Sequence, residues 1–284
     1  MSLFVDSHQH FWDPARADYP WMTDEVAAIR RAFMPDDLRP LLADAGVAYT
    51  VLVQARSDLE ETRELLALAA HTDFIAGVVG WADLTLPELA DTLAELKAGE
   101  GGEKLVGIRH QVHDEPDEAW LTRDDVKRGL RSVRDAGLAY DLLVRTRELA
   151  AALAVASELD DLRFVVDHIA KPRIAAGPRD EEWAQRLASF ADLEHVSCKV
   201  SGLVTEAEWR AWRGVDLAPY VERVADWFGE DRLLFGSDWP VCLLAASYRE
   251  VWETARSLLP YEKAFGANAI RLYRLEVGSC STTA

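Results

Sequence analysis

The chain has 284 residues, of which 49% are hydrophobic and 28% are charged. This composition supplies enough apolar material for a large core and excludes an intrinsically disordered chain. The length suits one large α/β unit, because a (β/α)8 barrel takes about 250 residues. The formal net charge of −18 argues against nucleic acid and against an anionic membrane surface as partners.

Short runs rich in β-branched residues alternate with longer amphipathic runs along the chain. The short runs predict strands at residues 4–8, 50–55, 75–81, 105–110, 139–144, 163–169, 196–200 and 233–236. The longer runs predict helices at 58–70, 87–98, 123–136, 146–159, 181–190, 217–228, 248–258 and 261–275. Such alternation indicates parallel strands with right-handed crossovers. Eight units favour a closed TIM barrel over an open sheet, and the first strand is followed by no GxGxxG motif.

We therefore expect an α/β protein with a single-domain (β/α)8 barrel at residues 1–276 and a frayed tail at 277–284. Residues 11–35 have too few periodic positions for a full helix and predict an ordered loop over one end of the barrel. Gly46, Gly137 and Gly229 follow helical runs, where a left-handed residue often ends a helix. Asp58 and Thr146 are the expected N-caps.

The cysteines and the amino-terminal sequence bear on the cellular compartment. Cys198, Cys242 and Cys280 lie far apart and form no CxxC motif, which excludes a disulfide framework and a zinc ribbon. No apolar run approaches 18 residues, and the first residues do not have the pattern of a signal peptide. We expect a cytoplasmic protein.

Polar residues stand at the C-terminal ends of the predicted strands, which converge on one mouth of a barrel. They are His8 and His10, Gln54, Arg109 and His110, Asp141, Asp167 and His168, Lys199, and Asp238 and Trp239. Residues two apart in a strand point to the same side, so His8 and His10 can bind one cation. Alternatively, the two imidazoles only form hydrogen bonds at the mouth. We favour the metal, because His168 and Asp238 can reach the same point.

Asp238 stands in the segment FGSDWP, directly after an apolar strand. Its carboxylate can take a proton from water and return it to a leaving group, or it can cap the following turn. We expect the first role. Arg109 and Lys199 can pair with Asp141 and Asp167, or they can hold an oxygen-rich ligand, and both interpretations remain open.

Other residues near the mouth have less specific roles. Gln54 and His110 are candidates for hydrogen bonds to a ligand or within the core, and His113 is a weaker loop candidate. Four tryptophans can form the apolar walls of a pocket: Trp12, Trp21, Trp81 and Trp239.

Together these motifs resemble the amidohydrolase superfamily, and within it the amidohydrolase-2 group of TIM-barrel metal-dependent hydrolases. The matching segments are VDSHQHFWDP at 5–14, VLVQA at 51–55, VGIRHQV at 106–112, VVDHIAKP at 165–172, KVSGL at 199–203, FGSDWPV at 235–241 and FGANAIRLYRL at 265–275. They run nearly from end to end. Within the group they resemble sugar-lactone hydrolases, such as fucono- and rhamnono-lactonases.

The resemblance implies a role for each of these positions. The metal ligands would be His8, His10, His168 and Asp238, and the catalytic residues would be His168 and Asp238, with Asp238 as proton shuttle. The substrate-binding candidates are Gln54, Arg109, His110, Asp141, Lys199 and Trp239.

Two departures from the family pattern bear on the cofactor. Arg109 and His110 stand where binuclear members carry a bridging carboxylated lysine or glutamate. Tyr140 and Asp141 stand where many members carry a further histidine. The resemblance therefore implies one divalent metal ion, Zn or Mn, or no required metal, as in some related lactonases.

We accordingly predict a hydrolase that opens a sugar lactone to the free sugar acid. The alternatives are a non-oxidative decarboxylase of the same superfamily and a barrel that binds sugar acids without turnover. The segment DHxxKP at 167–172 favours hydrolysis. The predicted partner is a small-molecule sugar lactone, with no nucleic acid and no membrane, and a homo-oligomer is compatible with the sequence.

Overall fold

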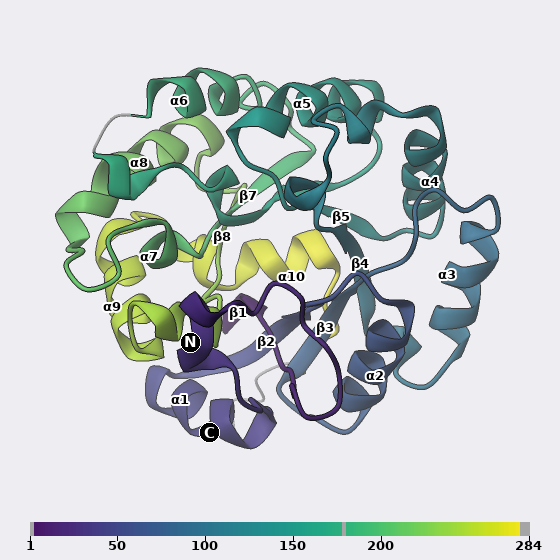
Figure 1. The fold of residues 1–284 in the computed structure, drawn as a ribbon, viewed down its shortest axis with the longest axis horizontal. Helices are drawn as coiled ribbons and strands as arrows, with labels where there is room; N and C mark the ends of the chain where they lie inside the picture. The colour runs from purple at the N-terminus through teal and green to yellow at the C-terminus, as the bar shows by residue number, and fades with distance from the viewer. Residues whose placement is uncertain (1–2, 178–179, 279–284) are drawn as a thin grey trace.

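Eight parallel strands form a barrel in the computed structural model, which describes residues 3–177 and 180–278 (Figure 1). The strands are β1 (Phe4–Gln9), β2 (Val47–Val53), β3 (Ile75–Gly80), β4 (Leu105–His110), β5 (Ala139–Leu142), β6 (Phe164–Val166), β7 (Val196–Val200) and β8 (Leu233–Phe235). Each strand pairs with the next along the chain. The ring closes where the Asp238 N–H donates to the His8 carbonyl (2.8 Å) and the His10 N–H donates to the Trp239 carbonyl (2.7 Å). The predicted TIM barrel is confirmed.

Helices follow the strands; most of them surround the ring, and the helix Ala267–Tyr273 lies across it (Figure 1). They are α1 (Pro35–Ala45), α2 (Leu59–Ala70), α3 (Leu89–Ala98), α4 (Asp124–Asp135), α5 (Leu149–Glu158), α6 (Glu181–Ala188), α7 (Leu203–Glu206), α8 (Gly214–Phe228), α9 (Tyr248–Leu258) and α10 (Ala267–Tyr273). The sequence analysis did not predict α1 and α7. The segment 11–35 is a loop with one short 3-10 turn, Asp24–Ile29, as expected.

The local signals at helix ends were right in all but one case. Gly46, Gly137 and Gly229 have φ of 69°, 75° and 65°, and the Asp58 side chain caps α2 by accepting from the Glu60 N–H. Thr146 is not an N-cap, because it lies inside a short 3-10 turn, Thr146–Glu148. The turn is capped differently: the Glu148 carboxylate accepts a hydrogen bond from the N–H of Arg145, the residue before the turn (2.9 Å).

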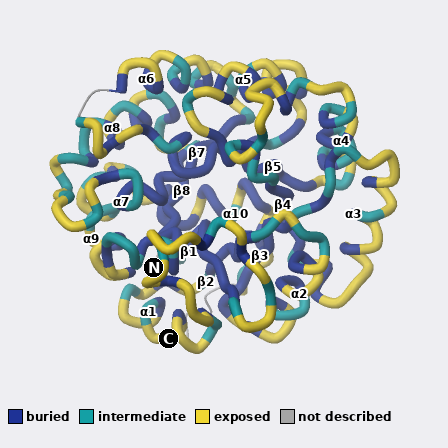
Figure 2. The backbone as a smooth tube through the Cα atoms, viewed as in Figure 1, coloured by how far each residue is buried: buried dark blue, intermediate teal, exposed yellow. Residues whose placement is uncertain are grey.

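The inside of the barrel is filled in layers, and the buried strands occupy the centre of Figure 2. Inward-facing apolar residues of the strands, such as Val51, Val165 and Leu234, pack against Leu272 and Tyr273 of α10. Figure 1 shows α10 lying across the ring of strands. The Tyr273 hydroxyl donates to the Asp141 carboxylate (2.7 Å), so α10 contacts the polar layer that lies above the apolar one.

Strand β6 is shorter than predicted because the chain leaves it in a left-handed turn. His168, Ile169, Ala170 and Lys171 have φ of 53°, 47°, 60° and 49°. This conformation costs about 1–2 kcal/mol for each residue that is not glycine. Strain of this kind is concentrated at functional sites, where the surrounding structure enforces it.

Within the described ranges, no helix combines the length and the apolar character needed to cross a bilayer. The expected tail at 277–284 lies outside the described residues from residue 279 onward. Cys198 and Cys242 are buried free thiols. The cytoplasmic location remains a prediction.

Candidate active site

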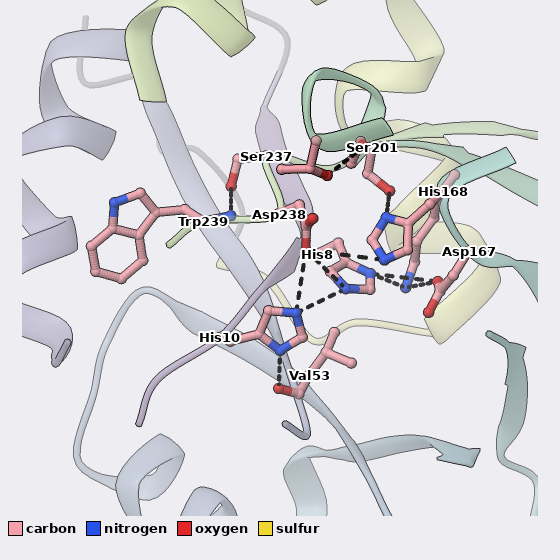
Figure 3. Close-up of polar contacts among 12 residues, drawn as sticks. His8, His10, Val53, Asp167, His168, Ser201, Ser237, Asp238 and Trp239 are labelled. Carbon is pink, nitrogen blue, oxygen red and sulfur yellow. Dashed lines mark hydrogen bonds and ion pairs between the residues drawn. The ribbon is translucent and has the colours of Figure 1, made fainter. Parts of the chain in front are cut away.

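Three imidazoles and one carboxylate converge at the C-terminal end of the barrel (Figure 3). His8 and His10 come from the end of β1, His168 follows β6, and Asp238 follows β8. The Nε2 atoms of His8 and His10 lie 3.1 Å apart. The Asp238 Oδ1 atom lies 3.4 Å from His10 Nε2, 3.7 Å from His8 Nε2 and 4.0 Å from His168 Nε2. All four residues are at most 4% exposed. The structure therefore brings together the four residues that the sequence indicated.

The backbone around Asp238 holds its carboxylate against the histidines. Asp238 has a left-handed φ of 56°, and its N–H bonds to the His8 carbonyl across the closing seam of the barrel. Gly236 allows this close approach, because a Cβ there would lie 2.6 Å from the Cβ of His8. Among the described residues, the polar contacts of the Asp238 carboxylate are with imidazoles. The alternative that Asp238 is a helix cap is therefore not supported.

Hydrogen bonds on the outer nitrogens orient the imidazole rings. His10 Nδ1 lies 2.7 Å from the Val53 carbonyl, which can only accept, so Nδ1 carries a proton. His168 Nδ1 bonds to the Ser201 hydroxyl (2.9 Å). His8 Nδ1 lies 3.4 Å from Asp167 Oδ1. The inner nitrogens therefore point toward one another and toward Asp238.

The charge states follow from burial. Desolvation lowers the pKa of His8 and of His168 well below the ordinary value, so both rings are neutral near pH 7. Burial alone would raise the pKa of Asp238, but a hydrogen bond with His10 and the charge of Lys171 are among the interactions that bring this pKa below its ordinary value. The site thus holds the ionised carboxylate of Asp238 beside the neutral imidazoles of His8 and His168.

The donor set fits one divalent cation. One ligand atom each from His8, His10 and Asp238 lie within 4.8 Å of one another, and imidazole nitrogen with carboxylate oxygen suits Zn²⁺ or Mn²⁺. A second group, with Asp167 and His168 beside His8, has the same spacing. Asp167, however, already accepts from Arg109 Nη1 (3.0 Å) and lies 3.0 Å from Lys199 Nζ. Two positively charged side chains thus already neutralise the Asp167 carboxylate, so its charge is not available to a second metal ion.

A buried ionic layer lies directly beneath the histidines. Lys199 Nζ lies 2.5 Å from Asp141 Oδ2, and it also contacts His8 Nδ1 (3.2 Å). Burial raises the pKa of Asp141 to about 6. Burial also acts to raise the pKa of Asp167, but Lys199, His8 and Arg109 hold it well below its ordinary range. Both Arg109 and Lys199 therefore form the ion pairs with aspartates that one of the two interpretations predicted.

A cavity of about 250 Å³ opens above the four converging residues. Its lining consists of His10, Trp12, Trp21, Ala55, Arg109, Gln111, His113, Asp114, Leu143, Arg145, His168, Lys171, Asp238 and Val241. Of the predicted substrate-binding residues, Arg109 is part of this lining. Gln54, Asp141 and Lys199 are fully buried and are not part of the lining, and their role in substrate binding stays a prediction.

Two other predicted residues also lie outside the lining. His110 Nδ1 accepts from the Trp81 indole (2.9 Å), its Nε2 donates to Glu115 (2.7 Å), and its ring stacks on Trp120. His110 therefore braces the loop after β4. The Trp239 indole points away from the imidazoles in Figure 3 and packs against Phe33 at a centroid distance of 5.3 Å.

The sequence analysis missed several lining residues on the loops after β4, β5 and β6. They are Gln111, Asp114, Arg145 and Lys171. All four follow predicted strand ends within a few positions. Their sequence positions do not reveal which loop side chains turn inward, because that depends on how each loop packs.

Comparisons with known proteins agree with this geometry. A sequence model of the Amidohydrolase family matches residues 5–275. The chain is 42% identical to the L-fucono-1,5-lactonase of Burkholderia multivorans, over 96% of this chain and 97% of that protein. It is 40% identical to the L-fucono-1,5-lactonase of Burkholderia ambifaria, over 97% of each. A crystal structure of an amidohydrolase from Burkholderia multivorans with bound zinc has a TM-score of 0.88 at 41% identity and covers 97% of this chain and 100% of that chain.

The contact of Gly202 with the site predicts a stability difference between two glycine variants. A Cβ on Gly202 would lie 2.6 Å from His168 Nδ1 and 3.2 Å from Asp238 Oδ2, whereas Gly46, which has nearly the same left-handed backbone (φ 69°, ψ 22° against φ 64°, ψ 8° at Gly202), has nothing within 4 Å. Both alanine variants carry the left-handed strain, but Gly202→Ala adds overpacking of about 1–3 kcal/mol. Calorimetry should show a midpoint several degrees lower for Gly202→Ala than for Gly46→Ala. Equal midpoints would contradict the described contact.

Proposed function

This chain belongs to the amidohydrolase family, and we propose from that premise that it hydrolyses the ester bond of a sugar lactone to give the free sugar acid. The observation that carries the proposal is the ionised carboxylate of Asp238 beside neutral imidazoles at the floor of the cavity. A carboxylate in this setting can accept a proton from water. The two L-fucono-1,5-lactonases at 42% and 40% identity support a six-membered sugar lactone as the substrate class.

In the proposed reaction one carboxylate moves one proton twice. Water attacks the lactone carbonyl carbon while Asp238 takes its proton. The bond from that carbon to the ring oxygen then breaks, and Asp238 returns the proton to the departing alkoxide. The low pKa of Asp238 keeps it ionised for the first step and makes its acid form a ready donor in the second. Asp238 is thereby returned to its ionised form, and the product is the free carboxylic acid.

The other residues at the floor of the cavity orient Asp238 and polarise the lactone carbonyl. His168, held by Ser201 (2.9 Å), keeps a neutral ring against Asp238. The Arg109 guanidinium reaches the cavity from the ionic layer, so the chain itself supplies a cation for the carbonyl oxygen. One Zn or Mn ion would be held by His8, His10 and Asp238, and His168 lies within reach of the same point. When bound, such an ion polarises a carbonyl and lowers the pKa of water.

The first experiment tests the reaction. With L-fucono-1,5-lactone, the purified protein should release acid that a pH indicator records. Acid release should be slower with an acyl-homoserine lactone, because its acyl chain must pass the charged side chains of Arg145, Lys171 and Asp114. Faster hydrolysis of the acylated lactone would overturn the sugar assignment. Release of CO2 from an aromatic acid would indicate a decarboxylase, and binding of the sugar acid without lactone turnover would indicate a non-catalytic barrel.

A second experiment isolates the proton shuttle. Asp238→Asn keeps the size of the side chain and suits the left-handed backbone, but an amide cannot accept the proton. We expect kcat to fall by about 10²–10⁴-fold, with a small change in thermal midpoint. Near wild-type kcat would refute the catalytic role of Asp238.

A third experiment concerns the metal. Elemental analysis of the purified protein should find at most one equivalent of divalent transition metal per chain, and His8→Ala should lower that occupancy. His71→Ala is the matched control, because His71 is an exposed histidine paired with Glu100. Two equivalents in the wild-type protein would contradict the single site. Full activity after chelation would leave the polarising role to Arg109 and the histidines.

A further inference from the structure

Lys171 of the DHxxKP segment lines the cavity, and the reaction proposed above gives it no contact with the substrate. It lies at the end of the left-handed turn that begins at His168, and the Lys171 N–H closes that turn on the His168 carbonyl (2.8 Å). The Trp183 indole holds the turn by donating to the Ile169 carbonyl (2.6 Å). These hydrogen bonds therefore hold a backbone conformation that is energetically unfavourable by itself.

The turn has a clear geometric consequence. It places His168 and Lys171, three residues apart, on the same cavity, while Ile169 and Ala170 between them are fully buried. An extended continuation of β6 would instead alternate its side chains between the two faces of the sheet. The left-handed segment thus places the His168 imidazole at the floor of the cavity and the Lys171 side chain in its wall.

A second element fixes the ammonium group. Lys171 Nζ donates to Glu206 Oε1 at the end of α7 (2.9 Å), and the two side chains are 15% and 20% exposed. Within residues 3–177 and 180–278 this is the one hydrogen bond of the ammonium group, which has three N–H donors. Because the pair is neutral overall, it suits a neutral polar ligand better than an anion. A hydroxyl group both donates and accepts, so it can bond to the ammonium and to the carboxylate of such a pair.

We propose that Lys171, oriented by Glu206, binds ring hydroxyls of the lactone and thereby selects hydroxylated over plain lactones. The proposal rests on the function proposed above and adds a specificity-determining residue to it. Lys171 shares the lining of the cavity with Asp238 at its floor and with His113 and Asp114 of the loop after β4.

The test compares two substrates across three variants. L-fucono-1,5-lactone carries ring hydroxyls, and δ-valerolactone has the same six-membered lactone ring without them. Lys171→Met should lower kcat/KM for the hydroxylated lactone about 10- to 100-fold more than for δ-valerolactone, as expected for the loss of a hydrogen bond to a charged group. Loss of the lysine charge beside Asp238 acts on both lactones alike, so the ratio between the two substrates reports the contact with the ring hydroxyls. Glu206→Gln keeps the ammonium and should lose less. Lys127→Met is the matched control, because Lys127 forms an equal 2.9 Å pair with Glu158 away from the cavity.

Each outcome separates one explanation from another. Equal losses on both lactones, or equal losses in Lys171→Met and Glu206→Gln, would overturn the proposal in favour of a structural ion pair. If the wild-type protein hydrolyses neither lactone, the proposed function has failed. Calorimetric binding of the corresponding sugar acid, L-fuconate, then still tests Lys171: weaker binding in Lys171→Met than in Lys127→Met supports the contact, and equal binding refutes it.

Discussion

The site depends on a layer of charged side chains buried inside the barrel, beneath the histidines. Lys199 bridges Asp141 and Asp167, and Arg109 completes the layer by donating to Asp167. Removing one member would leave an uncompensated buried charge, which is far more costly than the intact set. Because Lys199 and Asp167 also contact His8 Nδ1, this layer sets the position of the histidine at the centre of the site.

The layer also connects the site to the far end of the barrel. Tyr273 of α10 donates to both oxygens of Asp141, and its neighbours in α10 pack on the apolar interior. The closing helix, the apolar layer, the ionic layer and the four converging residues are therefore stacked in contact. Rigid support of this kind is what a catalytic constellation requires, since small displacements of reacting groups cost large factors in rate.

Backbone strain occurs at the end of the barrel interior that faces the cavity. Asp238 and the segment from His168 to Lys171 have left-handed backbones although none of them is glycine. The hydrogen bonds of Trp183 to Ile169 and of Asp238 to His8 hold these conformations. The lactone-hydrolysing site thus uses the stability of the barrel to fix side chains in positions that relaxed strands would not give them.

The sequence by itself determined the barrel, its strand order and the four residues that converge, because strand periodicity and the position of polar residues at strand ends are local properties. It also placed Arg109 and Lys199 inside. Only the tertiary structure decided that Lys199 pairs with aspartates below the cavity, that His110 braces a loop, and that Lys171 lines the wall. These outcomes depend on a left-handed turn and on contacts between residues distant in the chain, and neither is encoded in a local pattern of residue types.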